Sequence, residues 1–401
     1  MRTSLFAFVS DLLEEGTDAV LRNVRDRAAV GGLTVAAAYH AARDVVPHSP
    51  RGLVRFLEPG VVYFHPDPAR WTGRRLQPRP SALVAHADPI AELCALGAAE
   101  GFDVDAWVVF LHNDRLGFEQ PGCAPRNAFG DRYLTDLCPA HTDVRAYVRA
   151  LAGDVARLGV GSVVAESLHH HPFEHGYHHE RAFVELSDHA RRLLGLCFCD
   201  SCLAAAEARD VDGRAARTVA RRGIERALVG AEEVGFDRTL LRDYLEARSH
   251  TVTSLAAEAA EAVTAEGSTL RFMDLSGAVA GYATGRPSGP PVVEDAFDLL
   301  GVAVPRVAEP CAAIDALGYA AEPQRVALDL DAYRALLHPG APLGLVLRPT
   351  PPDCVSVVNL RAKVAVARAH GVDRLAFYHY GLMPLEALDW IAAALDGSPA
   401  A

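Results

Sequence analysis

Eight short apolar segments recur along the chain, and this recurrence constrains the fold more than any other feature of the sequence. The segments span residues 4–11, 32–40, 104–114, 160–171, 268–277, 313–323, 342–350 and 373–381. Their apolar residues follow one another without alternation, which is typical of strands buried on both faces. Stretches with helical periodicity lie between them. Eight strand–helix units predict a single α/β domain with the (β/α)8 TIM-barrel fold, and a doubly wound open sheet is the alternative.

The barrel is expected to occupy residues 1–401 as one catalytic domain. Two stretches exceed what a minimal barrel needs. Residues 41–85 are rich in Pro and Arg, and they predict a long loop between the second strand and the second helix. The stretch of about 180–265 has helical periodicity, and it predicts a helical insertion between strands four and five.

The charge and the motifs of the chain exclude several classes of partner. The formal net charge is −12, and the basic residues form no dense run. Neither a nucleic acid nor a membrane is therefore an expected partner. The first strand is not followed by a Gly-x-Gly-x-x-Gly motif, so the sequence does not support a dinucleotide site. Abundant Ala, Gly, Pro and Arg are typical of a bacterial genome rich in G and C.

The N-terminal segment and the cysteine content bear on the compartment. Asp11, Glu14 and Glu15 interrupt the first apolar segment, so we interpret it as a strand and not as a signal peptide. No stretch approaches the length of uncharged apolar sequence that crosses a membrane. Eight Cys without a secretion signal indicate a reducing compartment. These features predict a cytoplasmic protein.

Polar residues stand at the ends of the predicted strands, where the active site of such a barrel lies. Carboxylates, imidazoles, amides and aromatic rings in one ring suit a polyhydroxylated ligand, since rings stack on sugar C–H faces and polar groups bond the hydroxyls. We predict a small-molecule carbohydrate or glycoside as the partner, and the sequence leaves a homo-oligomer open as the assembly. The residues predicted to bind this substrate are Asp11, His40, His112, Asn113, Asp114, His169, His170, Tyr319, Arg348, Tyr378 and His379.

Glu166 is the strongest catalytic candidate. It follows the apolar run Ser-Val-Val-Ala and precedes a tract rich in His. Burial beside the rim of the barrel raises the pKa of a Glu carboxyl toward that of a general acid. Cleavage of a glycosidic bond needs a second carboxylate, and Asp274 on strand five is the first choice for it. Glu322 on strand six is the second choice.

The tract from His169 to His179 leaves three interpretations open. Residues 169–180 hold six His, of which the first three are consecutive. These side chains can hydrogen-bond substrate hydroxyls, bind a catalytic metal, or lie in a solvated loop. A metal-dependent barrel hydrolase or lyase that uses this tract is therefore an alternative function. A non-catalytic carbohydrate-binding barrel is a second alternative.

Three cysteines occur within six residues as Cys-x-Cys-x2-Cys. Cys197, Cys199 and Cys202 are close enough to share one Zn²⁺, and a tetrahedral site needs a fourth ligand. Cys138 is the first candidate for that ligand and Cys123 the second. Structural zinc is the predicted cofactor, and no organic cofactor is expected. Free buried thiols and a redox dithiol are the alternatives.

Together, a Cys-Pro pair before a helix, a strand that ends in an acidic residue, and the Cys-x-Cys-x2-Cys motif form a pattern that resembles the glycoside hydrolase superfamily of (β/α)8 barrels. The chain is similar to the hypothetical glycosyl hydrolases related to α-amylases. Its cysteine motif resembles that of family 42 β-galactosidases, in which such cysteines bind zinc. The resemblance implies an enzyme that cleaves a small glycoside or oligosaccharide by carboxylate acid/base catalysis. The chain departs from family 42 in Ala165, where those enzymes have Asn, and in the absence of a Glu from strand seven.

Overall fold

A computed structural model describes residues 1–173, 181–231, 238–281 and 289–396. Its centre is a closed barrel of eight parallel strands, in which β1 pairs with both β2 and β11. The predicted (β/α)8 barrel is therefore confirmed, and each predicted apolar segment contributes one strand. The barrel strands are β1 (Arg2–Ala7), β2 (Gly32–Tyr39), β6 (Asp103–Val109), β7 (Ser162–Glu166), β8 (Thr269–Asp274), β9 (Ala313–Leu317), β10 (Leu343–Leu347) and β11 (Arg374–Phe377).

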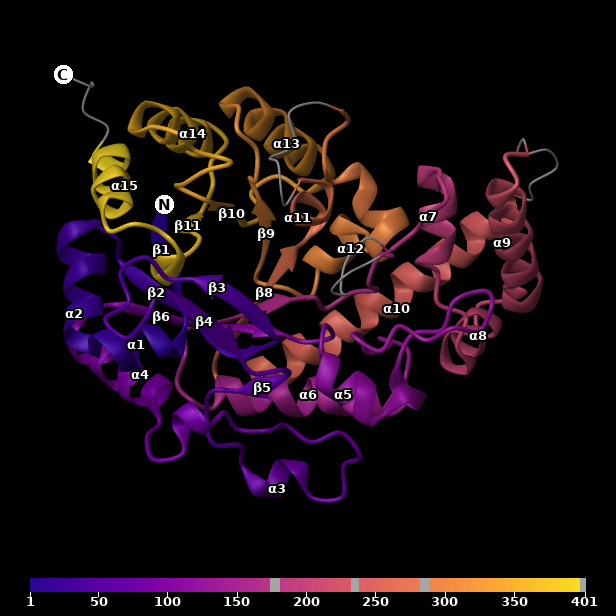
Figure 1. The fold of residues 1–401 in the computed structure, drawn as a ribbon, viewed down its shortest axis with the longest axis horizontal. Coiled ribbons are helices and arrows are strands. Elements are labelled where there is room, and N and C mark those ends of the chain that lie inside the picture. The colour runs from indigo at the N-terminus through magenta and orange to yellow at the C-terminus, as the bar shows by residue number, and fades with distance from the viewer. Residues whose placement is uncertain (174–180, 232–237, 282–288, 397–401) are drawn as a thin grey trace.

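Helices surround the barrel and follow its strands in sequence (Figure 1). Within the described residues, none of the helices is long and apolar enough to cross a membrane. The helices that pack near the strands are α1 (Val9–Glu15), α2 (Thr17–Arg22), α4 (Pro89–Glu100), α5 (Asp114–Glu119), α6 (Thr142–Ala156), α10 (Arg238–Thr264), α11 (Ser276–Gly281), α12 (Val304–Ala308), α13 (Pro323–Leu336), α14 (Val357–Ala369) and α15 (Glu386–Asp396).

The interior of the barrel is mostly apolar, and it contains a buried ion-pair network in the first halves of several strands. Arg271 of β8 contacts Asp315 of β9 at 2.6 Å, and Arg374 of β11 contacts Asp105 of β6 at 3.0 Å. All four side chains are buried. Such charges are tolerated because each one has a partner of opposite sign. They lie away from the strand ends where a barrel carries its active site.

The long segment after β2 is more ordered than the loop that its composition predicts. It contains a hairpin of β3 (Ala42–Val45) and β4 (Val54–Leu57), a short strand β5 (Val61–Val62) antiparallel to the end of β2, and the short helix α3 (Pro68–Trp71). Asp44 and Arg55 face each other across the hairpin. Arg55 reaches from it to Asp11 at 2.7 Å, so the hairpin is tied to α1 at the C-terminal end of β1.

The predicted helical insertion lies between β7 and β8. It consists of α7 (Asp188–Leu194), α8 (Asp200–Glu207), α9 (Gly213–Leu228) and the first part of α10. Figure 1 shows α7, α8 and α9 on one side of the barrel, away from α14 and α15. These helices share an apolar core of their own, in which Phe198 stacks on Tyr244 with ring centroids 4.7 Å apart. The rest of α10 packs against α6 and β8 as a barrel helix.

Candidate active site

Aromatic side chains cover the floor of the barrel at the C-terminal ends of the strands. Trp107 of β6 lies at the centre of this floor, 4.7 Å from Tyr39, 5.8 Å from Phe8 and 5.7 Å from Tyr378 between ring centroids. His379 packs on Phe8 at 4.2 Å. Trp107 lies two residues before the end of β6, and the others end a strand or follow one, which is why segments distant in sequence meet here. Trp107, Phe8 and His379 are each 1% exposed and Tyr39 is 8% exposed, so Tyr378 keeps the most accessible surface of these rings.

Glu166 is held directly against this floor. It is the last residue of β7, two residues beyond Val164, which pairs with Trp107 in the neighbouring strand. Because side chains alternate along a strand, Glu166 and Trp107 project from the same face of the sheet. The indole Nε1–H of Trp107 donates a hydrogen bond to Oε2 of Glu166 at 2.5 Å. The next residue, Ser167, has a left-handed backbone with φ of 54°, a conformation that non-glycine residues adopt mainly at functional sites and turns.

The environment of Glu166 suits a proton donor. Burial of the carboxyl group raises its pKa to about 7, against the opposing influence of the Trp107 hydrogen bond and the charge of His112. The side chain nevertheless keeps part of its surface accessible. A carboxyl that is surrounded by protein and still reachable can hold a proton near neutral pH and transfer it to a bound molecule.

Asp274, the first predicted partner of Glu166, is enclosed at the end of β8. Its side chain is fully buried. One carboxylate oxygen accepts hydrogen bonds from the backbone N–H and the hydroxyl of Ser276, at 3.0 and 2.7 Å. The other accepts one from the hydroxyl of Tyr333 in α13 at 2.6 Å. These contacts join β8 to α11 and α13, and they give Asp274 a structural setting that differs from that of Glu166.

Glu322, the second predicted partner, is exposed on the turn before α13. Its backbone carbonyl accepts from Arg325 and Val326 in the first turn of that helix. The structure does not bring Glu322 and Asp274 into one pair with Glu166 through any described contact. A catalytic role for either residue stays a prediction.

Three predicted substrate-binding residues form local contacts at helix starts. Asp11 lies in α1 instead of at the end of β1, where it accepts from the backbone N–H of Phe8 at 2.9 Å and from Arg55. Asn113 caps α5 by accepting from Leu116 N–H at 3.0 Å. Asp114 is the first residue of α5 and accepts from the next backbone N–H. Their side chains thus order the backbone around the barrel mouth.

The histidines that follow the strands divide into two groups. His40 stacks on Tyr39 at 4.2 Å, and its ring lies 4.7 Å from that of His112 at the barrel mouth. His169 and His170 are buried, at 2% exposure each, and the backbone N–H of His170 donates to Leu300. Both therefore point into the protein instead of toward solvent. The remainder of the predicted histidine tract, residues 174–180, lies outside the described residues.

Tyr319, Arg348 and Tyr378 lie together on the side of the mouth formed by β9, β10 and β11. The guanidinium of Arg348 lies 4.2 Å from the ring centroid of Tyr319, whose ring is 6.3 Å from that of Tyr378. Arg348 also pairs with Asp353, a buried carboxylate in the loop after β10. Asp353 is absent from the sequence predictions, because it lies six residues beyond the end of its strand with no periodic pattern to mark it.

Asp136 is the second carboxylate that sequence reasoning missed. It lies in a loop between α5 and α6, and its Oδ1 atom is 3.1 Å from Nδ1 of His112 and 3.0 Å from Nδ1 of His171. The rings of His112 and His171 are stacked, with centroids 5.1 Å apart. The only signal in the sequence is its position two residues before Cys138, a candidate zinc ligand. These three side chains could hold a metal ion.

The four predicted zinc ligands come together in the structure. The Sγ atom of Cys138 lies 3.4 Å from those of Cys199 and Cys202, and 3.9 Å from that of Cys197. All four are buried. A tetrahedral ion with Zn–S bonds of about 2.3 Å separates its sulfurs by about 3.8 Å, so the donor set and its spacing fit Zn²⁺. Cys123, the second candidate, instead lies 4.0 Å from His141.

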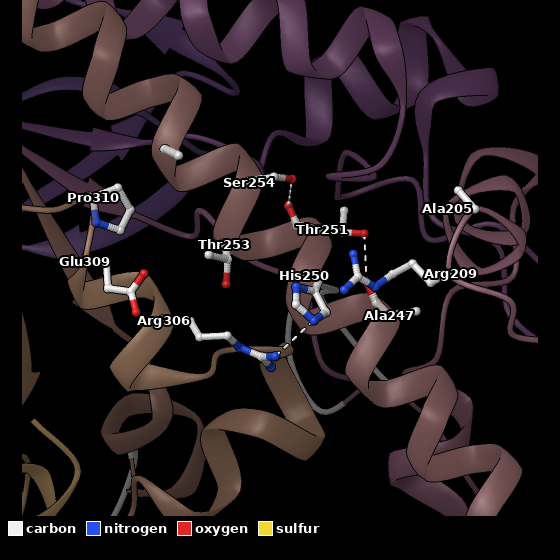
Figure 2. Close-up of a pocket in the computed structure, with 12 residues that line it drawn as sticks. Ala205, Arg209, Ala247, His250, Thr251, Thr253, Ser254, Arg306, Glu309 and Pro310 are labelled. Atoms are coloured by element: carbon white, nitrogen blue, oxygen red, sulfur yellow. Dashed lines mark hydrogen bonds between the residues drawn. The ribbon is translucent and has the colours of Figure 1, made fainter.

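A separate hollow of about 600 Å³ lies outside the barrel, between α8, α10 and α12 (Figure 2). Arg306 projects into it and donates a hydrogen bond to Nε2 of His250 at 3.1 Å. Arg306 is also bonded to Glu246 and Ser249. Arg306 thus has three side-chain partners at the edge of this hollow.

Comparison with known proteins supports the fold. Neither a family model nor a curated protein sequence matches the chain. Among solved structures, a β-galactosidase from the psychrophilic Marinomonas ef1 is similar with a TM-score of 0.57 and 12% identity, over 99% of this chain and 59% of that one. The catalytic domain of a β-amylase from Paenibacillus polymyxa has a TM-score of 0.56 and 9% identity, over 99% of both chains.

α-L-Fucosidase isoenzyme 2 from Paenibacillus thiaminolyticus is also similar, with a TM-score of 0.52 and 12% identity over 99% of this chain and 49% of that one. The chain thus spans about half of the fucosidase and about three fifths of the β-galactosidase. The expected resemblance to barrels of the glycoside hydrolase superfamily is confirmed for the fold. At such identities the likeness extends to the fold alone.

Proposed function

We propose that this chain hydrolyses the glycosidic bond of a small glycoside or oligosaccharide, with Glu166 as the general acid. The observation that carries this proposal is the setting of Glu166, a partly accessible carboxyl with a pKa of about 7 at the end of a barrel strand, beside a floor of aromatic rings. The names of the similar barrels, a β-galactosidase, a β-amylase and an α-L-fucosidase, add support of a general kind.

The roles of the surrounding residues follow from their contacts. Protonated Glu166 donates its proton to the leaving oxygen as the glycosidic bond breaks, and a water molecule then bonds to the anomeric carbon and returns a proton to the Glu166 carboxylate. The Trp107 N–H already points at its carboxyl group, so it stabilises the carboxylate that remains. Tyr39 and Tyr378 offer aromatic faces and hydroxyls to the sugar, and His40 and Arg348 offer further hydrogen bonds at the rim. We assign no role in water activation to Asp274, because both of its oxygens are engaged inside the protein.

A panel of aryl α- and β-glycosides tests the proposal, with the wild-type chain beside Glu166→Gln. Gln has nearly the shape of Glu but has no proton to donate as an acid. We expect hydrolysis of at least one glycoside, and a loss of kcat/KM on the order of 10² or more in the variant. Equal activity in the two proteins would remove Glu166 from the chemistry. Sugar binding without any hydrolysis would favour the non-catalytic barrel instead.

We also propose that Cys138, Cys197, Cys199 and Cys202 hold a structural Zn²⁺. The ion would tie the loop before α6 to the start of α8, two segments about 60 residues apart that meet at the four sulfurs. Metal analysis of the purified chain should find zinc that Cys199→Ser loses, together with a lower unfolding temperature. Cys94→Ser is the matched control, because Cys94 lies outside the cluster in α4. Zinc that Cys199→Ser retains would refute this site.

A further inference from the structure

We propose that His112, Asp136 and His171 form a second metal site, which binds a divalent transition-metal ion at the mouth of the barrel. The site is separate from the cysteine cluster in ligand chemistry, since it offers two imidazoles and one carboxylate instead of four thiolates. It goes beyond the proposed hydrolysis, because binding of the ion does not require any glycoside to be cleaved.

The spacing of the donor atoms carries the inference. Oδ1 of Asp136 is 3.1 Å from Nδ1 of His112 and 3.0 Å from Nδ1 of His171. All three ligand atoms lie within 4.8 Å of one another. An ion with metal–nitrogen and metal–oxygen distances of about 2.0 to 2.2 Å places neighbouring ligand atoms about 3.0 to 3.5 Å apart. One carboxylate oxygen facing two imidazole nitrogens at this separation fits a shared cation, and the same spacing fits hydrogen bonds to the carboxylate when no ion is bound.

The backbone around the site holds these donors in place. His112 follows β6, and the segment 111–113 is hydrogen-bonded to 135–137: Asn113 N–H donates to Thr135 O at 2.9 Å, and Leu137 N–H to Leu111 O at 2.8 Å. This pairing sets His112 beside Asp136. The stacked ring of His171, which follows β7, completes the group. Backbone hydrogen bonds thus hold two of the three donors together, and the third packs on His112 by ring stacking, which gives the ordered frame that a metal site requires.

Thr135 orients the carboxylate of Asp136 through a hydrogen bond. Its hydroxyl donates to Oδ2 of Asp136 at 2.7 Å, so Oδ1 is the oxygen left to face the two histidines. Asp136 is only 2% exposed, and a buried carboxylate is stable when cations or hydrogen-bond donors surround it. A hydrogen bond to a ligating carboxylate is the usual outer contact of a metal site, and its loss commonly weakens binding 10- to 100-fold.

Two His and one carboxylate determine the class of ion. Imidazole and carboxylate ligands together suit Zn²⁺, Mn²⁺, Fe²⁺ or Co²⁺, whereas Ca²⁺ prefers a full set of oxygens. Three protein ligands leave coordination positions for water or for an oxygen of a bound molecule. His112 is also close enough to Glu166 for its charge to act on that carboxyl. An ion held here would lie near Glu166, and its charge would lower the pKa of that carboxyl below the value of the metal-free chain.

The test is the amount of metal bound by the full chain and by matched variants. Each protein is stripped with a chelator, incubated with Zn²⁺ or Co²⁺, desalted and analysed by mass spectrometry. We expect His171→Gln and Asp136→Asn to bind one ion per chain fewer than the wild type. His338→Gln is the control, because His338 is exposed and lies outside the site. The difference between proteins is the readout, so the result does not depend on the occupancy of the cysteine cluster.

A further variant distinguishes a loss of metal binding from a loss of folding. Thr135→Val keeps every ligand and should lower the affinity for Zn²⁺ 10- to 100-fold in a competition titration, with an unchanged circular dichroism spectrum. Equal metal content in the wild type, His171→Gln and Asp136→Asn would overturn the proposal, and the three side chains would then form a hydrogen-bonded triad. Because no step uses a glycoside, failure of the metal site and failure of the proposed hydrolysis are separate outcomes.

Discussion

Glu166 and Asp274 end adjacent parallel strands of the same barrel, yet their carboxyl groups have opposite surroundings. The carboxyl group of Glu166 has one described hydrogen bond, from the indole of Trp107, and part of the residue's surface is accessible. Asp274 is fully buried, and Ser276 and Tyr333 engage both of its oxygens. An acidic residue at the end of a barrel strand is thus not by itself a catalytic group. What distinguishes the two is whether the protein has already satisfied the carboxylate.

The difference has a physical consequence for each residue. A carboxyl group that accepts three internal hydrogen bonds is fixed in its place, and we expect it to contribute mainly to stability, while its catalytic role stays a prediction. A buried carboxyl with a single donor keeps its proton up to a higher pH, and it can give that proton to a ligand. Variants of the two residues test this comparison. We expect changes at Glu166 to lower activity and changes at Asp274 to lower stability, and the opposite result would contradict it.

The largest effect is expected for Glu166→Gln, and it should depend on the leaving group. A general acid matters most when the departing alcohol is a poor leaving group. We therefore expect kcat/KM to fall by about 10² to 10⁴ for glycosides of weakly acidic alcohols, and by less for strongly activated phenols. Measurement of both substrate types with each protein checks this. A loss that is the same for all leaving groups would mean that Glu166 binds the substrate without protonating it.

The next effect concerns stability as a function of pH. The pKa of Glu166 is raised from its ordinary value of 4.5 to about 7 in the folded chain. The folded state therefore favours the protonated form, and this contribution to stability is lost as the pH rises from 4.5 through 7. Glu166→Gln removes the titrating group. Its free energy of unfolding should match that of the wild type near pH 4 and exceed it by up to about 3 kcal/mol at pH 8.

Urea unfolding at several pH values measures this difference. Asp274→Asn is the comparison variant, because it removes the other strand-end carboxyl. A difference between Glu166→Gln and the wild type that is constant from pH 4 to pH 8 would contradict the raised pKa of Glu166. It would also weaken the assignment of this residue as the acid.

Asp274 should show a smaller effect, and mainly on stability. Asp274→Ala leaves the hydroxyls of Tyr333 and Ser276 without their acceptor inside the protein. We expect a loss of about 2 to 3 kcal/mol in the free energy of unfolding. Tyr333→Phe should lose about 1 kcal/mol through the same contact. Activity per folded molecule should stay within a few-fold of the wild type, and its disappearance in a stable variant would make Asp274 catalytic after all.

The sequence was sufficient for the barrel because the signal for each strand is local. A strand covered on both faces must be apolar throughout, so the eight segments are visible without any knowledge of their partners. The cysteine cluster could also be predicted, since three of its four residues lie within six positions of the sequence. The continuous apolar pattern did miss charged residues inside strands, such as Arg271 and Asp315, which are buried because each one pairs with groups of opposite charge.

The roles of the strand-end residues could not be predicted from the sequence, because these roles depend on partners that are distant in the chain. Tyr333, which engages Asp274, comes 59 positions later in the chain. Asp136 and Asp353 lie in loops, where no periodicity marks a residue that reaches the barrel mouth. Asp11 was misplaced for a local reason: β1 ends at Ala7, so the helix that follows it starts before Asp11.

The smallest expected effect is that of Trp107→Phe on the pH dependence of activity. The indole N–H bonds the charged form of Glu166 and so lowers its pKa, against the larger effect of burial. Phe keeps an aromatic ring in the floor but has no donor, so the pKa of Glu166 should rise. Because the acid form is the active one, the limb on which kcat/KM falls with rising pH should move to higher pH. If kcat/KM falls at the same pH in both proteins, a group other than Glu166 supplies the proton. The difference in surroundings between Glu166 and Asp274 would then not explain catalysis.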